Sequence, residues 1–361
     1  MKRFLEYGRT LLIGAIGALI FDLLHIPLAW MLGAMTAVLI MRNVPERKLP
    51  ALKINVHPNW RNGALLVIGC MIGTSFTAES ISALWSQLPS MFITNILLLL
   101  FCLLIGWWGA KWSGMSMQSG MIGNVPGGLT QMVMLGEEVK GADMTSVAVM
   151  QTIRVMAAIF IVPVWVVHGI SRSSTGAGTT VQTQDAAPFL EMPWPSWGIL
   201  LSCLLVCFIG AWCAGKLRFP TPYLLGPVFV TAFWGGVGLP IPVLPELILI
   251  VAQLFIGCYV GYGMKFDHVA SLKKLVSLSI IASVLAVLFS LVLGYGLTVI
   301  YSMSISTAFL SMAPGGMAEM GLTASLIGAD LPTVSSYQLF RILFILFIVP
   351  PLLRWLLVKR R

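Results

Sequence analysis

Residues 126–163 read PGGLTQMVMLGEEVKGADMTSVAVMQTIRVMAAIFIVP, and residues 314–350 read PGGMAEMGLTASLIGADLPTVSSYQLFRILFILFIVP. The two stretches share four motifs in the same order: P-G-G, G-A-D, Q-x-x-R and F-I-V-P. With one residue deleted, about 14 of roughly 37 aligned positions are identical. A repeat of this kind indicates that one structural unit is built twice, so we expect both stretches to fold alike.

The duplication extends towards the start of each half of the chain. Earlier matching motifs are Pro27 with Gly33 and Ile68–Cys70 in the first half, and Pro220 with Gly226 and Ile256–Cys258 in the second. The predicted organisation is a first membrane repeat, a polar Ser/Thr/Gly-rich linker and a second membrane repeat, over 1–170, 171–196 and 197–361.

The composition is that of a membrane protein. Of the 361 residues, 58% are hydrophobic and only 10% are charged, whereas soluble proteins carry about 25% charged residues. Apolar runs recur at about the 17–25 residues that a helix needs to cross a bilayer. We therefore predict an all-α polytopic membrane protein with the lipid bilayer as its main partner. The first apolar run comes after Met1-Lys2-Arg3 and could be read as a signal peptide. No small-residue cleavage site follows the run, and a second apolar run starts at once, so we interpret it as a transmembrane helix.

The net charge of +9 does not indicate direct nucleic-acid binding. The basic residues lie in short loops between apolar runs, as the positive-inside rule predicts, and no basic recognition motif accompanies them. The cysteines lie within apolar runs and form no C-x-x-C motif, so we interpret them as small buried hydrophobic residues: Cys70, Cys102, Cys203, Cys207, Cys213 and Cys258. No pattern in the chain indicates an oligomeric state.

Ten apolar stretches are candidate spans. They lie near 10–25, 27–41, 62–78, 89–110 and 144–167 in the first half, and near 197–214, 220–237, 246–263, 275–301 and 331–356 in the second. A Gly-rich segment with P-G-G in its middle separates the fourth and fifth spans of each half, at 117–136 and 304–328.

Loop charges favour segments that are broken or re-entrant over segments that cross fully. With five full crossings per half and a cytoplasmic N-terminus, almost every loop cation falls on the cytoplasmic side. Six crossings would put Lys216, Lys265 and Lys273 outside, against the positive-inside rule. An odd number of spans inverts the second half relative to the first, which is typical of secondary transporters. We predict inverted repeats of about five transmembrane helices, with both termini cytoplasmic.

The P-G-G motifs are the first candidate site. Proline removes a backbone donor and glycine permits unusual backbone conformations, so a helix is expected to break there. A helix that resumes after the break points free N–H groups into a cavity, which suits an anionic group. A simple kink is the alternative. The candidate residues are Pro126, Gly127, Gly128, Pro314, Gly315 and Gly316.

The Q-x-x-R motifs supply a second group of candidates. Gln151 and Arg154 share a helix face, and Arg154 lies about 16 Å along a helix that starts near Asp143. That is about half of a 30 Å bilayer core. Gln338 and Arg341 repeat the pattern from the opposite side. A cation at this depth marks either a binding site or a buried pair; alternatively, both arginines bind carbonyls exposed at the breaks.

Acidic residues in the repeat have two interpretations. Asp143 and Asp330 each precede an apolar run and are most simply helix N-caps, with ion coupling as the alternative. Glu319, which replaces Gln131 of the first copy, is the one acidic residue inside either P-G-G segment and a candidate proton site. No nucleophile or metal-ligand constellation, P-loop or G-x-G-x-x-G motif is present. We therefore predict no enzyme activity, no cofactor and no metal.

At P-G-G, G-A-D and M-Q-x-x-R the chain resembles the AbrB family of bacterial membrane proteins, which has a duplicated membrane domain and also carries the label ammonia monooxygenase. The matching residues are Pro126–Gly128, Gly141–Asp143, Met150, Gln151, Arg154 and Ile68–Met71. The resemblance implies a protein of the bacterial cytoplasmic membrane that acts in regulation of gene expression or in transport. Nothing in these residues supports the monooxygenase label. The second copy departs from the motif at Tyr337 and Glu319.

Three hypotheses follow. The first is a secondary-transporter-like protein that binds a small anionic solute at the midplane, between the breaks and the two arginines. The second is a membrane-embedded regulator or sensor without transport. The third is a metal oxygenase of the ammonia-monooxygenase type, which the residues favour least.

Overall fold

The computed structural model describes most of the chain, and all regular elements in the described part are helical. The described residues are 2–44, 54–127, 132, 139, 141–170, 194–217, 219, 221–237, 239–240, 244–264 and 273–358. The predicted linker therefore lies outside the described residues as far as 193, and Gly128, Gln131 and Lys265 also lie outside them.

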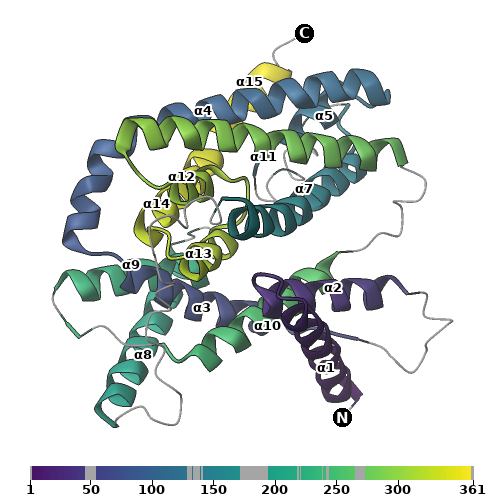
Figure 1. Cartoon of the computed structure of the whole chain (residues 1–361). Coiled ribbons are helices and arrows are strands. Elements are labelled where there is room, and N and C mark those ends of the chain that lie inside the picture. The colour runs from purple at the N-terminus through teal and green to yellow at the C-terminus, as the bar shows by residue number, and fades with distance from the viewer. Residues whose placement is uncertain are drawn as a thin grey trace. The chain divides into compact units, whose positions relative to one another are not determined.

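The helices follow one another in the order shown in Figure 1. Their bounds are α1 Lys2–Leu23, α2 Ala29–Asn43, α3 Pro58–Thr74, α4 Ala78–Ser113, α5 Met117–Asn124, α7 Met144–Trp165, η2 Val166–Ile170, α8 Trp194–Lys216, α9 Pro222–Gly236, α10 Glu246–Gly263, α11 Lys273–Tyr301, α12 Ile305–Met312, α13 Met317–Leu326, α14 Leu331–Phe347 and α15 Val349–Val358.

The two short helices before the P-G-G motifs begin in the same way. The Ser116 hydroxyl accepts a 3.2 Å hydrogen bond from the Ser119 N–H at the start of α5. The Ser304 hydroxyl accepts one of the same length from the Thr307 N–H at the start of α12. Serine caps the first turn because its oxygen satisfies an N–H that has no partner within the helix. Each helix then has eight residues and ends just before its P-G-G motif.

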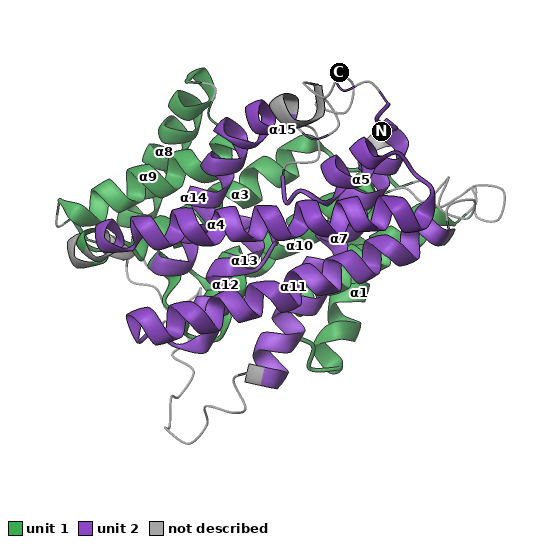
Figure 2. Ribbon diagram, turned by 90° about the horizontal axis from the view of Figure 1, so that it is seen from above, with its two compact units in different colours: residues 1–83, 172–266, 321–332 green, residues 84–171, 267–320, 333–361 purple. Residues whose placement is uncertain are grey.

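The chain forms two compact units (Figure 2). Unit 1 contains residues 1–83, 172–266 and 321–332, and unit 2 contains residues 84–171, 267–320 and 333–361. Each unit thus gathers segments from both halves of the sequence. Both Q-x-x-R motifs belong to unit 2, together with both P-G-G motifs.

Glycines let the helices of unit 1 pack backbone to backbone. A Cβ on Gly33 of α2 would lie 2.3 Å from the Gly17 carbonyl oxygen of α1, and a Cβ on Gly226 of α9 would lie 2.5 Å from that of Gly210 of α8. Only glycine permits such approaches, which are common between helices in membranes. The α1–α2 pair is therefore packed in the same way as the α8–α9 pair.

Unit 2 is built around three long helices, α4, α7 and α11. Phe101 of α4 stacks on Phe289 of α11 with ring centroids 3.9 Å apart. The helix α5 packs against α7, and α12 packs against α11. Tyr337 of α14 is fully buried beside α4, where its hydroxyl lies 2.9 Å from that of Ser90.

In the part of the chain that the structure describes, five helical segments are long and apolar enough to cross a membrane: Leu84–Ser113, Met144–Gly169, Trp197–Lys216, Glu246–Gly263 and Lys274–Tyr301. Large apolar side chains are widely exposed, among them Leu23, Trp112 and Phe233, and such surfaces fit lipid contact. The structure is thus an all-helical fold of membrane-embedded character.

The sequence predicted ten crossings, and a helix occupies each of the ten stretches. In the remaining predicted stretches, the described helices are not both long enough and apolar enough to cross a membrane. For example, α2 and α9 each have 15 residues, fewer than the roughly 20 that a straight crossing requires.

Candidate functional site

The first Q-x-x-R motif holds the carbonyl groups left open where α5 ends. The Gln151 Nε2 donates to the carbonyls of Ile122 (3.1 Å) and Val125 (3.0 Å). Arg154 donates through Nη1 to Val125, and through Nη2 to the carbonyl of Gly127 at 3.0 Å. We call Gln151, Arg154 and these carbonyls the first clamp.

The second Q-x-x-R motif repeats these contacts at the end of α12. The Gln338 Nε2 donates to the carbonyls of Leu310 (2.7 Å) and Ala313 (3.2 Å). Arg341 donates through Nη1 to Ala313 and through Nη2 to Gly315, at 2.5 and 2.6 Å. We call this set the second clamp. Its carbonyls occupy the same positions relative to P-G-G as those of the first clamp.

The break in each helix explains why a glutamine and an arginine are needed. The last carbonyls of a helix have no partner within it, and proline at 126 and 314 supplies no N–H. In a low-dielectric interior each unpaired carbonyl costs free energy. The amide and the planar guanidinium bridge several carbonyls at once, and the cation also faces the negative end of the helix dipole. The structure thus confirms that the arginines bind carbonyls at the breaks.

The two clamps differ in their additional contacts. The second clamp also has long hydrogen bonds from Gln338 to the Ser311 carbonyl (3.5 Å) and from Arg341 to the Met312 carbonyl (3.4 Å). In the second clamp, Arg341 Nη2 also donates to the Gln338 Oε1. In the first clamp, the Gln151 Oε1 and the Arg154 Nε are buried and have no hydrogen-bond partner among the described residues, and the same holds for the nearby Asn124 Nδ2. Unsatisfied polar atoms therefore collect beside the first break.

Among the residues that the structure describes, no carboxylate pairs with the positive charges of the clamps. The hydrogen-bond partners of Arg154 and Arg341 in this part of the chain are carbonyl or amide oxygens. Both side chains are buried, and they lie close enough for their charges to repel each other, with Cys102 of α4 near both. The interior of unit 2 therefore contains two positive charges, those of Arg154 and Arg341.

The P-G-G residues of the two copies differ in their exposure to solvent. Pro314 is buried, Gly315 is half-buried and Gly316 is exposed. A Cβ on Gly316 would lie 2.0 Å from the Glu319 Oε2, so the carboxylate of α13 folds back over this glycine. In the first copy, Pro126 and Gly127 are half-buried, and the structure does not describe Gly128.

A methionine packs against the first glycine of each motif. A Cβ on Gly127 would lie 2.8 Å from Met132, and one on Gly315 would lie 2.5 Å from Met320. Both methionines are fully buried. They belong to the positions that are identical in the two copies, and their equal packing adds to the likeness of the two breaks.

The acidic residues before the Q-x-x-R helices lie at the predicted places. Asp143 caps α7, and its carboxylate accepts hydrogen bonds from the Ser146 N–H (2.9 Å) and hydroxyl (2.5 Å). The Ser146 hydroxyl is the main cause that holds the pKa of the Asp143 carboxyl below its usual value. Asp330 directly precedes α14, so it lies at the corresponding position of the second copy.

Comparison with known proteins gives the family. The model of the family described as "Transition state regulatory protein AbrB" matches residues 30–357. This chain belongs to the AbrB family. An uncharacterized protein of Bacillus subtilis (strain 168), YhjN, is 27% identical over 362 residues, covering 95% of this chain and 91% of the relative. A protein of Escherichia coli (strain K12) named "Putative regulator AbrB" is 27% identical over 354 residues, covering 98% and 97%.

The structure of this AbrB-family protein also brings together residues that the sequence did not connect. Cys70, Cys203 and Cys207 lie in unit 1 with their sulfur atoms within 4.8 Å of one another. Cys203 and Cys207 are four residues apart, a spacing that places them on one helix face and was the available sequence signal. The prediction that all six cysteines are buried is wrong for Cys213, which is exposed.

Proposed function

We propose that this AbrB-family protein is a secondary-transporter-like protein of the bacterial cytoplasmic membrane that binds a small anionic solute beside the two clamps. The observation that carries the proposal is the pair of buried arginines whose partners among the described residues are all neutral oxygens. A buried cation is costly in a membrane and usually marks a functional site. An anionic group that approaches both guanidiniums would relieve their mutual repulsion.

Paired helix contacts support inverted repeats. The contact of α1 with α2 has its counterpart in α8 with α9, and the contact of α3 with α9 has its counterpart in α10 with α2. In the proposed topology each repeat has five spans and one broken segment, and both termini are cytoplasmic. The clamps then approach the midplane from opposite sides, as broken helices do in transporters of this architecture.

Unsatisfied groups beside the first break support a bound solute. The buried Asn124 Nδ2 and Arg154 Nε are donors that have no partner in the described part of the chain, and buried donors of this kind normally find one. A carboxylate or phosphate oxygen would satisfy both while it compensates the charge of Arg154. Glu319, folded over Gly316, is the proposed proton-coupling group.

The test uses the purified full chain. Small carboxylates, phosphates and sulfonates are screened by thermal stabilisation, and the best binder is then measured as flux into proteoliposomes. Arg341→Lys keeps the charge but cannot bridge several carbonyls, so we expect a loss of flux of about tenfold or more, since one lost charge-assisted contact is worth about 1.4 kcal/mol or more. Lys274→Gln removes an exposed cation of α11 and is the matched control.

The unfolding temperature separates transport from folding. If an Arg341 variant unfolds at a lower temperature but transports like the wild type, the clamps have only a structural role. That outcome rejects the proposal. The absence of stabilisation and flux for all anions, with a folded wild-type protein, rejects it as well.

A second function, a membrane-embedded regulator, is favoured by the name of the Escherichia coli relative. The chain then acts on gene expression indirectly, because its basic residues form no nucleic-acid recognition motif. Deletion of the gene is expected to alter transcript levels without altering uptake or export of any small anion. A transport defect that precedes the transcriptional change favours the first function.

A further inference from the structure

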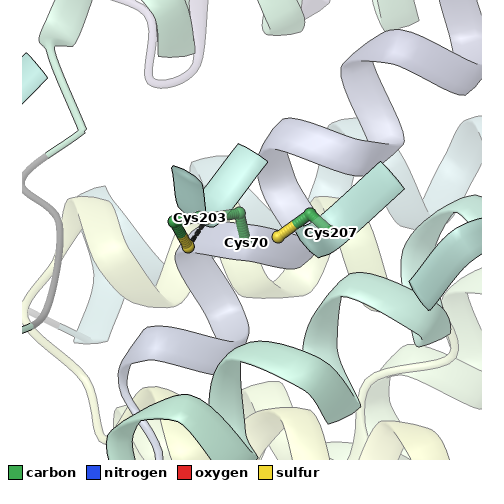
Figure 3. Close-up of side chains that lie close together, drawn as sticks. All are labelled: Cys70, Cys203 and Cys207. Atoms are coloured by element: carbon green, nitrogen blue, oxygen red, sulfur yellow. Dashed lines mark hydrogen bonds between the residues drawn. The ribbon is translucent and has the colours of Figure 1, made fainter. Parts of the chain in front are cut away.

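Three cysteine side chains from two helices meet in the interior of unit 1. Cys70 belongs to α3, and Cys203 and Cys207 lie one turn apart on α8. The Cys70 and Cys203 sulfurs are 3.7 Å apart, and all three sulfurs lie within 4.8 Å of one another. Figure 3 shows the Cys207 sulfur directed towards the other two. The side chains are at most 1% exposed.

These distances fit sulfur ligands around one ion. A Zn–S bond of about 2.3 Å with tetrahedral angles spaces neighbouring sulfurs about 3.8 Å apart, close to the distance between Cys70 and Cys203. The Cys207 sulfur lies within 4.8 Å of both. Among the described residues, no His, Asp or Glu joins the group, so the site offers three sulfurs and no fourth ligand.

The other half of the chain provides an internal comparison. Cys258 of α10 stands in the I-G-C motif that matches that of Cys70, and it packs on α1: its sulfur lies 3.9 Å from the Thr10 carbonyl and 2.5 Å from a Cβ placed on Gly14. Thr10 and Gly14 stand seven and three residues before Gly17, as Cys203 and Cys207 stand seven and three residues before Gly210.

The comparison separates packing from chemistry. A cysteine in the I-G-C motif serves the packing of both helix pairs. In the first half of the chain, the partner helix α1 has Thr10 and Gly14 at the positions that correspond to Cys203 and Cys207 of α8. Packing alone therefore does not require cysteines at 203 and 207, and the two additional sulfur atoms distinguish the α3–α8 contact from the α10–α1 contact.

The charge balance of the site selects the kind of ion. Soft sulfur ligands favour soft ions, and the thiolate is the form that binds. Three thiolates leave a net charge of −2 around Cu(I) and −1 around Zn(II), which is costly in an apolar interior. A trivalent centre leaves no net charge. A trivalent ion with a lone pair also needs no fourth ligand.

We propose that Cys70, Cys203 and Cys207 form a binding site for a trivalent thiol-seeking ion of the arsenite and antimonite class. Binding is a condensation: As(OH)3 reacts with three thiols to form three As–S bonds and three water molecules, and no oxidant or reductant is required. The neutral As(OH)3 molecule enters an apolar region more readily than a charged ion does. The three cysteines belong to unit 1, whereas the residues of the clamps belong to unit 2.

The experiment measures bound arsenic in the reduced, detergent-purified full chain. After incubation with sodium arsenite and desalting, we expect one arsenic per chain by elemental analysis, an ultraviolet absorption from As–S bonds, and a raised unfolding temperature. X-ray absorption is expected to show three sulfur neighbours. Serine substitutions at 70, 203 or 207 are expected to abolish the retained arsenic, whereas Cys258→Ser and Cys102→Ser retain it.

A double variant removes the folding ambiguity. Cys203→Thr with Cys207→Gly gives α8 the residues that serve in α1, so we expect it to fold with an unfolding temperature near that of the wild type and to hold no arsenic. The proposal is overturned if the wild type retains no arsenic, if the double variant retains as much as the wild type, or if Cu(I) or Zn(II) binds stoichiometrically while arsenite does not.

Discussion

Individual side chains at the breaks distinguish the two copies of the repeat. Gln338 bonds both the carbonyls and Arg341, whereas Gln151 bonds only carbonyls. A hydrogen bond to a charged group contributes about 1.5–3 kcal/mol, and one between neutral groups about 1 kcal/mol. The second clamp is therefore the more strongly coupled of the two.

This difference predicts unequal effects of the same substitution. Gln338→Leu is expected to lower the free energy of unfolding by about 1–2 kcal/mol more than Gln151→Leu. Thermal unfolding of both variants in the same detergent measures the difference. Equal losses would mean that the bond between Gln338 and Arg341 does not contribute to stability.

The cap of α7 predicts a dependence on pH. The pKa of Asp143 is lower in the folded state, so the stabilisation that it gives is present above its unfolded pKa of about 3.9. The stabilisation is lost as the pH falls through the lower folded pKa. Asp143→Ala is expected to lower stability by about 1 kcal/mol at pH 7 and by progressively less below pH 4. Unfolding temperatures over this pH range test the trend, and Asp143→Asn, which still caps, is the control.

Helix packing at the scale of elements rests on a few glycines. A Cβ on Gly226 would meet the Gly210 carbonyl at 2.5 Å and the Ala211 backbone at 2.6 Å, and neither can move without shifting a helix. Gly226→Val is expected to destabilise the protein by about 3 kcal/mol, and Gly33→Val by a similar amount. Gly63→Ala of α3 is the control: nothing lies within 4 Å, so we expect a gain of up to about 1 kcal/mol. The unfolding temperatures of the three variants test whether close backbone packing at these glycines stabilises the protein.

Local elements were predictable from the sequence, and contacts between them were not. The helix break at Pro314 and the cap at Asp143 follow from the chemistry of proline and aspartate, which acts within a few residues. The cysteine cluster depends on how α3 packs on α8, across 133 residues between Cys70 and Cys203. The short length of α2 and α9 was missed because flanking apolar residues outside the helices extend their hydrophobic runs.

The whole molecule carries a prediction about orientation. In the proposed topology, residues after α4 and after α8 lie on the cytoplasmic side although they belong to different halves. Lys111→Cys and Lys216→Cys are therefore both expected to react with a membrane-impermeant maleimide only in inside-out vesicles. A Cys213→Ser background removes the exposed native thiol. Labelling of the two sites from opposite sides would exclude inverted repeats of five spans.

The distance along the chain between each break and its clamp has a consequence for biosynthesis. The carbonyls of Ile122 and Val125 precede Gln151 by 29 and 26 residues, so the ribosome completes α5 well before the groups that satisfy it exist. Lipid offers no substitute donors. Nascent α5 must therefore wait in a hydrated or protein-lined channel until α7 is made, and the two helices enter the bilayer together.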